Sequence, residues 1–284
     1  MDEVAFFLRP RHEGWVIDGT VGMGGHAEAV LTMTPPTVRL LGLDADPEAL
    51  ARAQGRLARF GERVALEHAN FRDLGSVAQR HGIARAQAVL LDLGISSYQL
   101  DASGRGFSFQ GDEPLDMRLD PTTGRTAASL LNQLPEPELS RLIAEHGDEP
   151  HARRVARSIV RRRPLRTTRD LVAAVQSAVP RRAWPRRLHV ATRTFQAIRM
   201  AVNEEAEALR QALPDAAALL SPRARLVVIS FHSGEDRIVK QTFRSLASAG
   251  FAELEPSPFV PGDDEVRVNP RARSAKLRVL ERVS

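Results

Sequence analysis

The chain has 284 residues, 43% of them hydrophobic, which suits one large domain, or one domain with an insertion, around a sizeable core. It contains no cysteine, which excludes disulfides and cysteine-based metal or redox chemistry. No apolar run approaches the roughly 18 residues of a membrane span, and the N-terminus lacks a signal-peptide pattern, so we expect a cytoplasmic protein with no membrane partner. The formal net charge of +5, carried mainly by arginine, permits a nucleic-acid partner without demanding one.

A glycine-rich stretch follows the first predicted strand. Residues 15–18 form a short apolar run that ends in a carboxylate, residues 19–25 supply the glycines of a tight turn, and a helical pattern starts at Ala27. Strand, glycine loop and helix in this order build the nucleotide pocket of a doubly wound α/β domain. A single glycine-rich loop is a weak motif, because glycines also serve plain βα turns, so ligand binding and turn geometry both remain open.

Strand patterns alternate with helical patterns through this region and again near the C-terminus. The alternation predicts a parallel sheet joined by right-handed crossovers. One helix starts at Pro47 behind an Asp46 cap, and residues 251–254 and 275–280 predict a terminal antiparallel hairpin. The predicted parallel strands are residues 15–18, 39–43, 64–68, 88–92 and 225–230.

Three of these strands end in an aspartate. Asp18, Asp44 and Asp92 fall on the carboxyl edge of the predicted sheet, which also carries the glycine loop. Asp44 lies roughly 20 residues beyond Gly24, where an acidic side chain can accept hydrogen bonds from both hydroxyls of a ribose. One such aspartate is more often a turn residue, whereas three around one loop indicate a pocket. The pattern fits a dinucleotide or S-adenosylmethionine, and the glycine spacing departs from the dinucleotide fingerprint, which disfavours a hydride-transferring enzyme.

The pattern changes between residues 101 and 188. Residues 104–109 and 114–118 have no periodicity and predict a long ordered loop, which in a compact domain is usually functional. Only helical patterns follow, so we expect an all-α insertion at residues 113–190 between two parts of the α/β domain, residues 1–112 and 191–284. The predicted helices are residues 127–134, 136–146, 151–163 and 169–179, and one long helix at 191–210 leads back to the sheet.

Arginines concentrate in this insertion, with six in residues 153–163 and four in residues 181–187. Few acidic residues balance them, and the indole of Trp184 lies in the second cluster, a combination suited to phosphate contacts with base stacking. The alternative is a solvated helical face, which charge runs commonly form. We expect nucleic-acid contacts from Arg153, Arg157, Arg161, Arg182, Trp184 and Arg186.

A histidine follows the strand at residues 225–230. His232, flanked by Ser230 and Ser233, falls on the same sheet edge as the glycine turn. A lone histidine at a strand end is more often a hydrogen-bonded structural group. Within the predicted pocket, it becomes a candidate for contacting a base or handling a proton.

Seven strings along the chain belong together. They are DGTVGMGGH at 18–26, LLDLGISSYQLD at 90–101, RGFSF at 105–109, PLDMR at 114–118, ATRTFQAIR at 191–199, ISFHS at 229–233 and NPRARS at 269–274. In this order they closely resemble the bacterial ribosomal RNA small-subunit methyltransferase H family, also called MraW. The resemblance runs from about Trp15 to Arg282.

This resemblance implies a class I, S-adenosylmethionine-dependent methyltransferase fold, Rossmann-like, with an inserted helical domain. It implies N4-methylation of one decoding-site cytidine, numbered 1402 in the family's target, in 16S ribosomal RNA of the small ribosomal subunit. We expect no metal, and a monomer or a homodimer. Carried over position by position, the cofactor contacts are Gly24, Gly25, His26, Asp44, Phe71, Asp92 and Gln99.

The implied reaction is in-line attack of the cytosine exocyclic amine on the cofactor methyl group, with sulfur as the leaving group and positioning as the main source of acceleration. Residues 92–97 stand where many amino-methyltransferases carry an Asp/Asn-Pro-Pro-Tyr string. We expect Asp92, or a nearby serine such as Ser96, to accept an amine hydrogen bond, and His232 to make a second contact. The target base is expected to swing out of its stack.

Two departures from the family pattern matter. The family usually carries a longer segment with a His-x-Pro-Val-Leu-like string before the first strand, so we expect a shortened start and a missing part of the lid over the cofactor, which affects activity more than fold. Val190 and Gly234 replace a common proline and leucine, and neither removes a proposed cofactor contact.

Two rival functions remain. A nicotinamide-dependent oxidoreductase shares the glycine loop and the ribose-binding acid. A non-catalytic RNA-binding assembly factor fits the arginine-rich helices, although a pure binding module has no need of the pocket residues.

Overall fold

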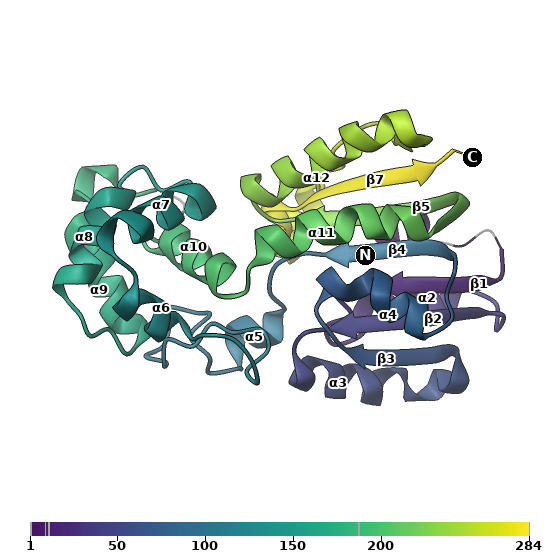
Figure 1. The fold of residues 1–284 in the computed structure, drawn as a ribbon, viewed down its shortest axis with the longest axis horizontal. Coiled ribbons are helices and arrows are strands. Elements are labelled where there is room, and N and C mark those ends of the chain that lie inside the picture. The colour runs from purple at the N-terminus through teal and green to yellow at the C-terminus, as the bar shows by residue number, and fades with distance from the viewer. Residues whose placement is uncertain (1, 9, 11, 187, 284) are drawn as a thin grey trace. The chain divides into compact units, whose positions relative to one another are not determined.

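The computed structural model describes residues 2–8, 10, 12–186 and 188–283 (Figure 1). The chain divides into an α/β unit, Met1–Gly94 with Ala206–Ser284, and a helical unit, Ile95–Glu205. The boundaries predicted at 112/113 and 190/191 differ from these, because side chains outside them, such as Phe107 and Phe195, are buried in the core of the helical unit. In the part of the chain that the structure describes, no helix is long and apolar enough to cross a membrane.

Within the described residues, seven strands form the sheet of the α/β unit, in the order β3-β2-β1-β4-β5-β7-β6. Neighbouring strands from β3 to β5 are parallel, and β7 runs antiparallel to both β5 and β6. The predicted fold class, a mostly parallel sheet that ends in an antiparallel pair, is confirmed. The strands are β1 (Gly14–Asp18), β2 (Val38–Asp44), β3 (Val64–His68), β4 (Ala86–Asp92), β5 (Leu220–Ser230), β6 (Phe251–Glu253) and β7 (Lys276–Arg282).

Helices cover both faces of this sheet. Ile17 and Leu41 pack with α4, α11 and α12, whereas their neighbours Val16 and Leu40 face the side of α1, α2 and α3, and all four are almost fully buried. Burial on both faces explains why the strands are nearly continuous apolar runs. The helices are α1 (Asp2–Leu8), α2 (Gly25–Met33), α3 (Pro47–Leu57), α4 (Leu74–Arg80), α11 (Glu205–Leu219), α12 (Ser233–Leu246) and α13 (Asp263–Val268).

The helical unit has a core of its own. Fully buried side chains such as Leu130, Ile143, Val155, Leu171 and Ile198 come from five successive helices. The helices are α5 (Ser97–Asp101), α6 (Ala127–Gln133), α7 (Glu136–Gly147), α8 (Ala152–Arg161), α9 (Thr168–Ala178) and α10 (Thr192–Val202). Helices α6 to α9 could be predicted from sequence because each has an apolar stripe at helical spacing.

The single long helix predicted at residues 191–210 is wrong. The structure has two helices there, α10 and α11, separated at Asn203 and Glu204, and Glu204 has a φ of 50°. The Asn203 side chain accepts the Leu119 N–H at 2.7 Å and donates to the Met117 carbonyl at 2.8 Å. These bonds to backbone more than 80 residues earlier in the chain favour ending α10 here, which local periodicity does not reveal.

Other differences concern short or irregular elements. The residues of α1 have no sequence pattern that predicts a helix, and α5 and α13 were not predicted either. Strand β5 begins at Leu220 rather than Arg225. This early part is irregular, since Arg223 has a φ of 63° and the register with β4 shifts between Ala86 and Ala88, so it lacks the alternation that identifies a strand.

We predict that Asn203→Ala lowers the free energy of unfolding by about 2–3 kcal/mol, because it leaves the Leu119 N–H and the Met117 carbonyl without these partners. Urea unfolding measures this loss. The exposed Arg210→Ala is the control, with an expected change below about 0.5 kcal/mol. Equal stability of the two variants would contradict the role assigned to Asn203.

Candidate active site

The candidate site lies at the carboxyl ends of β2, β1 and β4. The chain runs outward from β1 through β2 to β3 on one side and from β4 onward on the other, so β1 and β4 meet at the switch point where open α/β sheets bind ligands. Asp18 is opposite Gly42 on β2 and Leu90 on β4. Asp44 and Asp92 are therefore two positions further along their strands, and three carboxylates surround the end of β1.

The glycine loop leads directly into α2. Gly24, the residue before this helix, has a φ of 81°, and an added Cβ would lie 3.3 Å from the Leu57 side chain, so the position favours glycine in both respects. No side chain caps the start of α2 at Gly25. The first backbone N–H groups of the helix can therefore donate to a negatively charged group of a ligand.

Asp44 ties this loop to the next βα turn. Its carboxylate accepts the Gly22 N–H at 2.7 Å through Oδ2 and the Asp46 N–H at 2.8 Å through Oδ1. Burial raises the pKa of Asp44 to about 6, although both hydrogen bonds oppose this rise. The carboxylate thus shapes the loop, and each oxygen keeps a second lone pair for a ligand hydroxyl.

Asp18 is the most deeply buried of the three carboxyl groups, with 2% of its surface exposed. Burial raises its pKa to about 7, and the charges of Asp92 and Asp44 add to the rise. The positive charge of His26 and the Thr20 N–H, which donates to Asp18 at 3.1 Å, oppose it. The site therefore concentrates negative charge where water is largely excluded.

Asp92 and His26 form an ion pair across this edge, with 3.4 Å between Asp92 Oδ2 and His26 Nε2. Burial disfavours the protonated ring, but the hydrogen bond and charge of Asp92, with the charge of Asp18, outweigh it and raise the pKa of His26. The other oxygen, Asp92 Oδ1, is buried and forms no hydrogen bond with any residue that the structure describes. A buried carboxylate oxygen of this kind is suited to accept a hydrogen bond from a bound molecule.

Phe71 follows β3 and starts a short 3-10 helix, Phe71–Asp73. It lies against the start of the glycine loop, because a Cβ built on Gly19 would be 3.4 Å from the Phe71 Cβ and 2.6 Å from the Leu91 side chain. The ring therefore lies on the same edge as the three carboxylates and offers an apolar surface there.

His232 is engaged with its own helix. Its Nδ1 accepts the Glu235 N–H at 3.3 Å, which caps the start of α12, and its Nε2 lies 3.0 Å from Glu235 Oε1. Glu235 is buried and also accepts the Phe231 N–H at 3.0 Å. The Nδ1 of His232 thus has the structural role considered from sequence, whereas its Nε2 is buried and forms no hydrogen bond with any described residue. Glu235 was not among the residues predicted from sequence. Its position three residues after His232, the spacing of a helix-capping pair, is the signal that could have identified it.

Ser96 and Gln99 lie in the helical unit, where they form a capping box at the start of α5. The Ser96 hydroxyl oxygen accepts the Gln99 N–H at 3.1 Å, and Gln99 Oε1 accepts the Ser96 N–H at 2.8 Å. Both side chains are thereby held in place by local bonds.

The predicted nucleic-acid residues have different environments. Arg153, Arg161, Arg182 and Arg186 are exposed, and Arg157 pairs with Glu136 at 3.2 Å. The Trp184 indole donates to the Val179 carbonyl at 3.0 Å, and the Arg181 guanidinium lies 4.5 Å from the ring centre. One face of the indole is therefore covered by arginine, which leaves less of the ring for base stacking.

The comparisons with known proteins agree on one family. The model of the MraW methylase family matches residues 1–283. The chain belongs to this family. Proteins named ribosomal RNA small subunit methyltransferase H are 46% identical in Geobacter sp. (strain M21) and 48% identical in Syntrophotalea carbinolica, each over 301 residues that cover 99% of this chain and 96% of the relative. The same name is carried by a Kosmotoga olearia protein that is 46% identical over 100% of this chain and 96% of its own length.

Solved structures of low sequence identity also match the chain. An rRNA methylase from Streptococcus thermophilus is 12% identical with a TM-score of 0.48, over 100% of this chain and 93% of that chain. An S-adenosylmethionine-dependent O-methyltransferase from Thermotoga maritima is 11% identical with a TM-score of 0.44, over 100% of this chain and 64% of its own.

This MraW-family protein is a class I methyltransferase that uses S-adenosyl-L-methionine. The family and fold predicted from the seven strings are confirmed, and the nicotinamide-dependent oxidoreductase is ruled out. The site residues fit the cofactor chemically, since its sulfonium and ammonium groups are cations and three carboxylates surround the end of β1. Among the described residues, no group of three or more metal-binding side chains is found.

We predict that the contribution of Asp18 to the stability of the ligand-free MraW-family protein falls as pH rises from about 4 to about 7. The Asp18 carboxyl has a pKa of about 7 when folded, against an ordinary value of 3.8, so over this range the unfolded chain loses its proton first. Asp18→Asn keeps an acceptor for the Thr20 N–H and carries no charge. It should match the wild type near pH 4 and exceed its unfolding free energy at pH 8 by up to about 4 kcal/mol, at 1.36 kcal/mol per pKa unit.

Urea unfolding at the two pH values, without cofactor, tests this prediction. The exposed Asp263→Asn in α13 is the matched control and should show no pH-dependent advantage. If the stability difference between Asp18→Asn and the wild type is the same at pH 4 and pH 8, burial of the ionised Asp18 carboxylate does not cost the predicted free energy.

Proposed function

We propose that this methyltransferase transfers a methyl group to the exocyclic N4 of one cytidine in 16S ribosomal RNA, the position numbered 1402 in the family's target. Methylation of small-subunit ribosomal RNA as such follows from its family and from the relatives at 46–48% identity. The choice of N4 and of a single decoding-site cytidine is supported by the seven family strings. A substrate in the small ribosomal subunit also favours a cytoplasmic location.

The cofactor residues have distinct roles in this proposal. S-adenosyl-L-methionine supplies an electrophilic methyl group bonded to a positively charged sulfur. Backbone N–H groups at Gly25 and His26 would hold its amino-acid carboxylate at the start of α2. Gly24, whose own N–H donates to the Val21 carbonyl at 2.8 Å, would let the backbone approach the cofactor closely. Asp44 would accept the ribose hydroxyls and Phe71 would lie beside the adenine. The remaining contacts would come from Asp92 and Gln99.

One observation carries the catalytic part of the proposal, namely the buried, unpartnered Oδ1 of Asp92. This oxygen accepts a hydrogen bond from the target amine and orients the nitrogen lone pair. The amine must lose a proton as its new N–C bond forms, and Asp92 Oδ1 can receive it. His26, 3.4 Å from the other oxygen, holds the carboxylate in place. Ser96 and His232 are less favoured candidates, because the Ser96 hydroxyl and His232 Nδ1 already accept helix-capping N–H groups and His232 Nε2 lies 3.0 Å from Glu235 Oε1.

RNA contact is assigned to the helical unit. We assign phosphate contacts to Arg153, Arg157, Arg161, Arg182 and Arg186, with Trp184 beside them. Their number and exposure support the assignment, since arginine forks suit phosphate oxygens.

Methyl transfer from labelled S-adenosyl-L-methionine tests the function, with intact 30S subunits and deproteinised 16S ribosomal RNA as substrates. We expect one methyl group per subunit on the N4 of a decoding-site cytidine, identified by digestion and mass spectrometry. Binding without transfer would instead support the non-catalytic assembly factor. A label on ribose, on a ring carbon or on another base would overturn the assigned reaction.

We predict that Asp92→Asn lowers the single-turnover rate of methyl transfer by roughly 10²–10³-fold, because a neutral amide is a poor proton acceptor. Calorimetry measures cofactor affinity separately, so weakened binding is not mistaken for lost chemistry. Asp263→Asn, an exposed change of the same type, should leave both quantities unchanged. Normal cofactor binding with a normal rate in Asp92→Asn would remove this carboxylate from the mechanism.

A further inference from the structure

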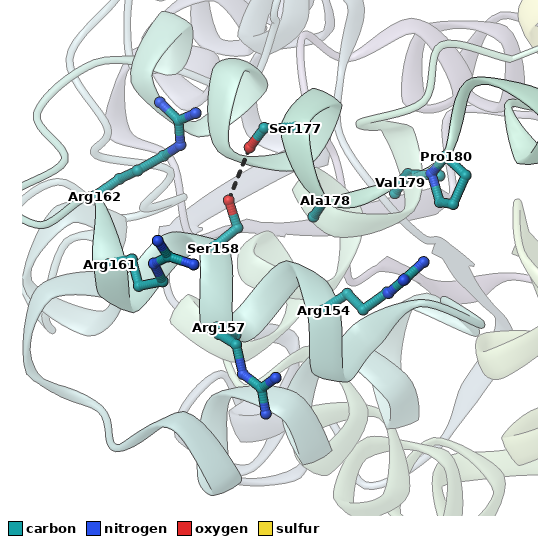
Figure 2. Close-up of a pocket in the computed structure, with 9 residues that line it drawn as sticks. All are labelled: Arg154, Arg157, Ser158, Arg161, Arg162, Ser177, Ala178, Val179 and Pro180. Atoms are coloured by element: carbon teal, nitrogen blue, oxygen red, sulfur yellow. Dashed lines mark hydrogen bonds between the residues drawn. The ribbon is translucent and has the colours of Figure 1, made fainter.

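A groove of about 640 Å³ lies between α8 and the end of α9 in the helical unit (Figure 2). Its charged lining comes from one helix, α8 and its C-terminal cap, through Arg154, Arg157, Arg161 and Arg162. Ser158 and Ser177 lie between the two helices. In the view of Figure 2, Arg161 and Arg162 are on one side of this serine pair and Arg154 is on the other.

Helical spacing explains why these four arginines lie together. They follow the i, i+3, i+7, i+8 pattern of one helix face, opposite the buried Val155 and Ile159. At 1.5 Å per residue, Arg154 to Arg162 spans roughly 12 Å along the helix. This length admits more than one phosphate of a strand, which rises about 3.4 Å per nucleotide in a duplex.

The groove carries uncompensated positive charge. The guanidinium groups of Arg154, Arg161 and Arg162 are exposed and form no hydrogen bond or ion pair with any described residue, whereas Arg157 pairs with Glu136. No acidic side chain lines the groove. The C-terminus of α9 adds about half a negative charge, far less than three free guanidinium groups.

The base of the groove is held together by hydrogen bonds. The hydroxyls of Ser158 and Ser177 both donate to the Ala174 carbonyl, at 2.8 and 2.9 Å, and their oxygens are 3.0 Å apart. The bond from Ser158 fastens α8 to α9, whereas the bond from Ser177 lies within α9. The arginines are therefore mounted on a preformed surface, which reduces the ordering cost when an anion binds.

We infer that this groove binds the phosphodiester backbone of small-subunit ribosomal RNA. The inference deepens the proposed function and rests on its RNA substrate. Free guanidinium forks along a 12 Å line match consecutive phosphates rather than the edge of a base. The groove therefore contributes affinity and register without reading sequence, and it adds Arg154 and Arg162 to the arginines expected to contact RNA.

The test measures RNA binding, without methyl transfer, for R154A/R161A/R162A. A control triple, R125A/R141A/R169A, removes the same formal charge from exposed positions of the same unit outside the groove. Affinity for deproteinised 16S ribosomal RNA and for 30S subunits is measured across a salt series. We expect the groove triple to bind both at least about 10-fold more weakly near 0.1 M salt. The slope of log affinity against log salt should fall by about 2, at roughly 0.7 per lost phosphate contact.

The control triple should change the slope by much less. Single Arg154→Gln and Arg161→Gln substitutions, each expected to lower the slope by about 0.7, report on the groove with minimal structural change. If the two triple variants lose the same RNA affinity, the groove is not a specific phosphate site and diffuse charge attraction explains the binding. Loss of binding to 30S subunits alone would overturn RNA as the partner and indicate an acidic protein surface. Because the experiment measures RNA affinity and not methyl transfer, it tests the groove even if the methylated atom is not N4.

Discussion

Three carboxylates around the end of one buried strand are the constraint on which this site depends. Parallel pairing of β1 with β2 and β4 brings Asp18, Asp44 and Asp92 to a single edge. Burial there raises the pKa of Asp18 to about 7 and of Asp44 to about 6, so the ligand-free protein holds negative charge at a cost. A cationic ligand relieves that cost. The edge is thereby matched to a sulfonium compound more closely than to an anionic dinucleotide.

Asp44 connects this charge to the geometry of the backbone. Its two oxygens bind N–H groups of Gly22 and Asp46, one in each of two successive βα turns. The glycine loop, with Gly24 at a φ of 81°, is thus shaped by the residue that is proposed to bind the ribose. Loop conformation and ribose recognition are coupled, because a change at Asp44 alters both.

Much of the fold was predictable from sequence because its signals are local. Strands β1, β2 and β4 are apolar runs with buried side chains on both faces, and the half-buried edge strand β3 is a shorter apolar run. Helices α6 to α9 carry apolar stripes, so periodicity located all these elements to within a few residues. The break after α10 was not predictable in this way. It accompanies bonds from Asn203 to the backbone of Met117 and Leu119, a long-range contact that leaves no local pattern. The unit boundaries depend on similar long-range packing.

The functional residues also divide into those with a local sequence signal and those that depend on long-range contacts. The strand-end aspartates could be predicted from sequence because the order of parallel strands places them on one edge. The pairing of His26 with Asp92 could not, because it depends on how the two side chains are oriented in the folded chain. Arginine content likewise located a basic helix but could not rank its members. Arg163 donates to the carbonyls of Leu131 and Leu134 and so serves the fold, although it is adjacent to Arg162 in the groove. Neighbouring arginines of equal charge therefore have different environments, and the bonds that each guanidinium already makes decide which of them are available for the proposed RNA contacts.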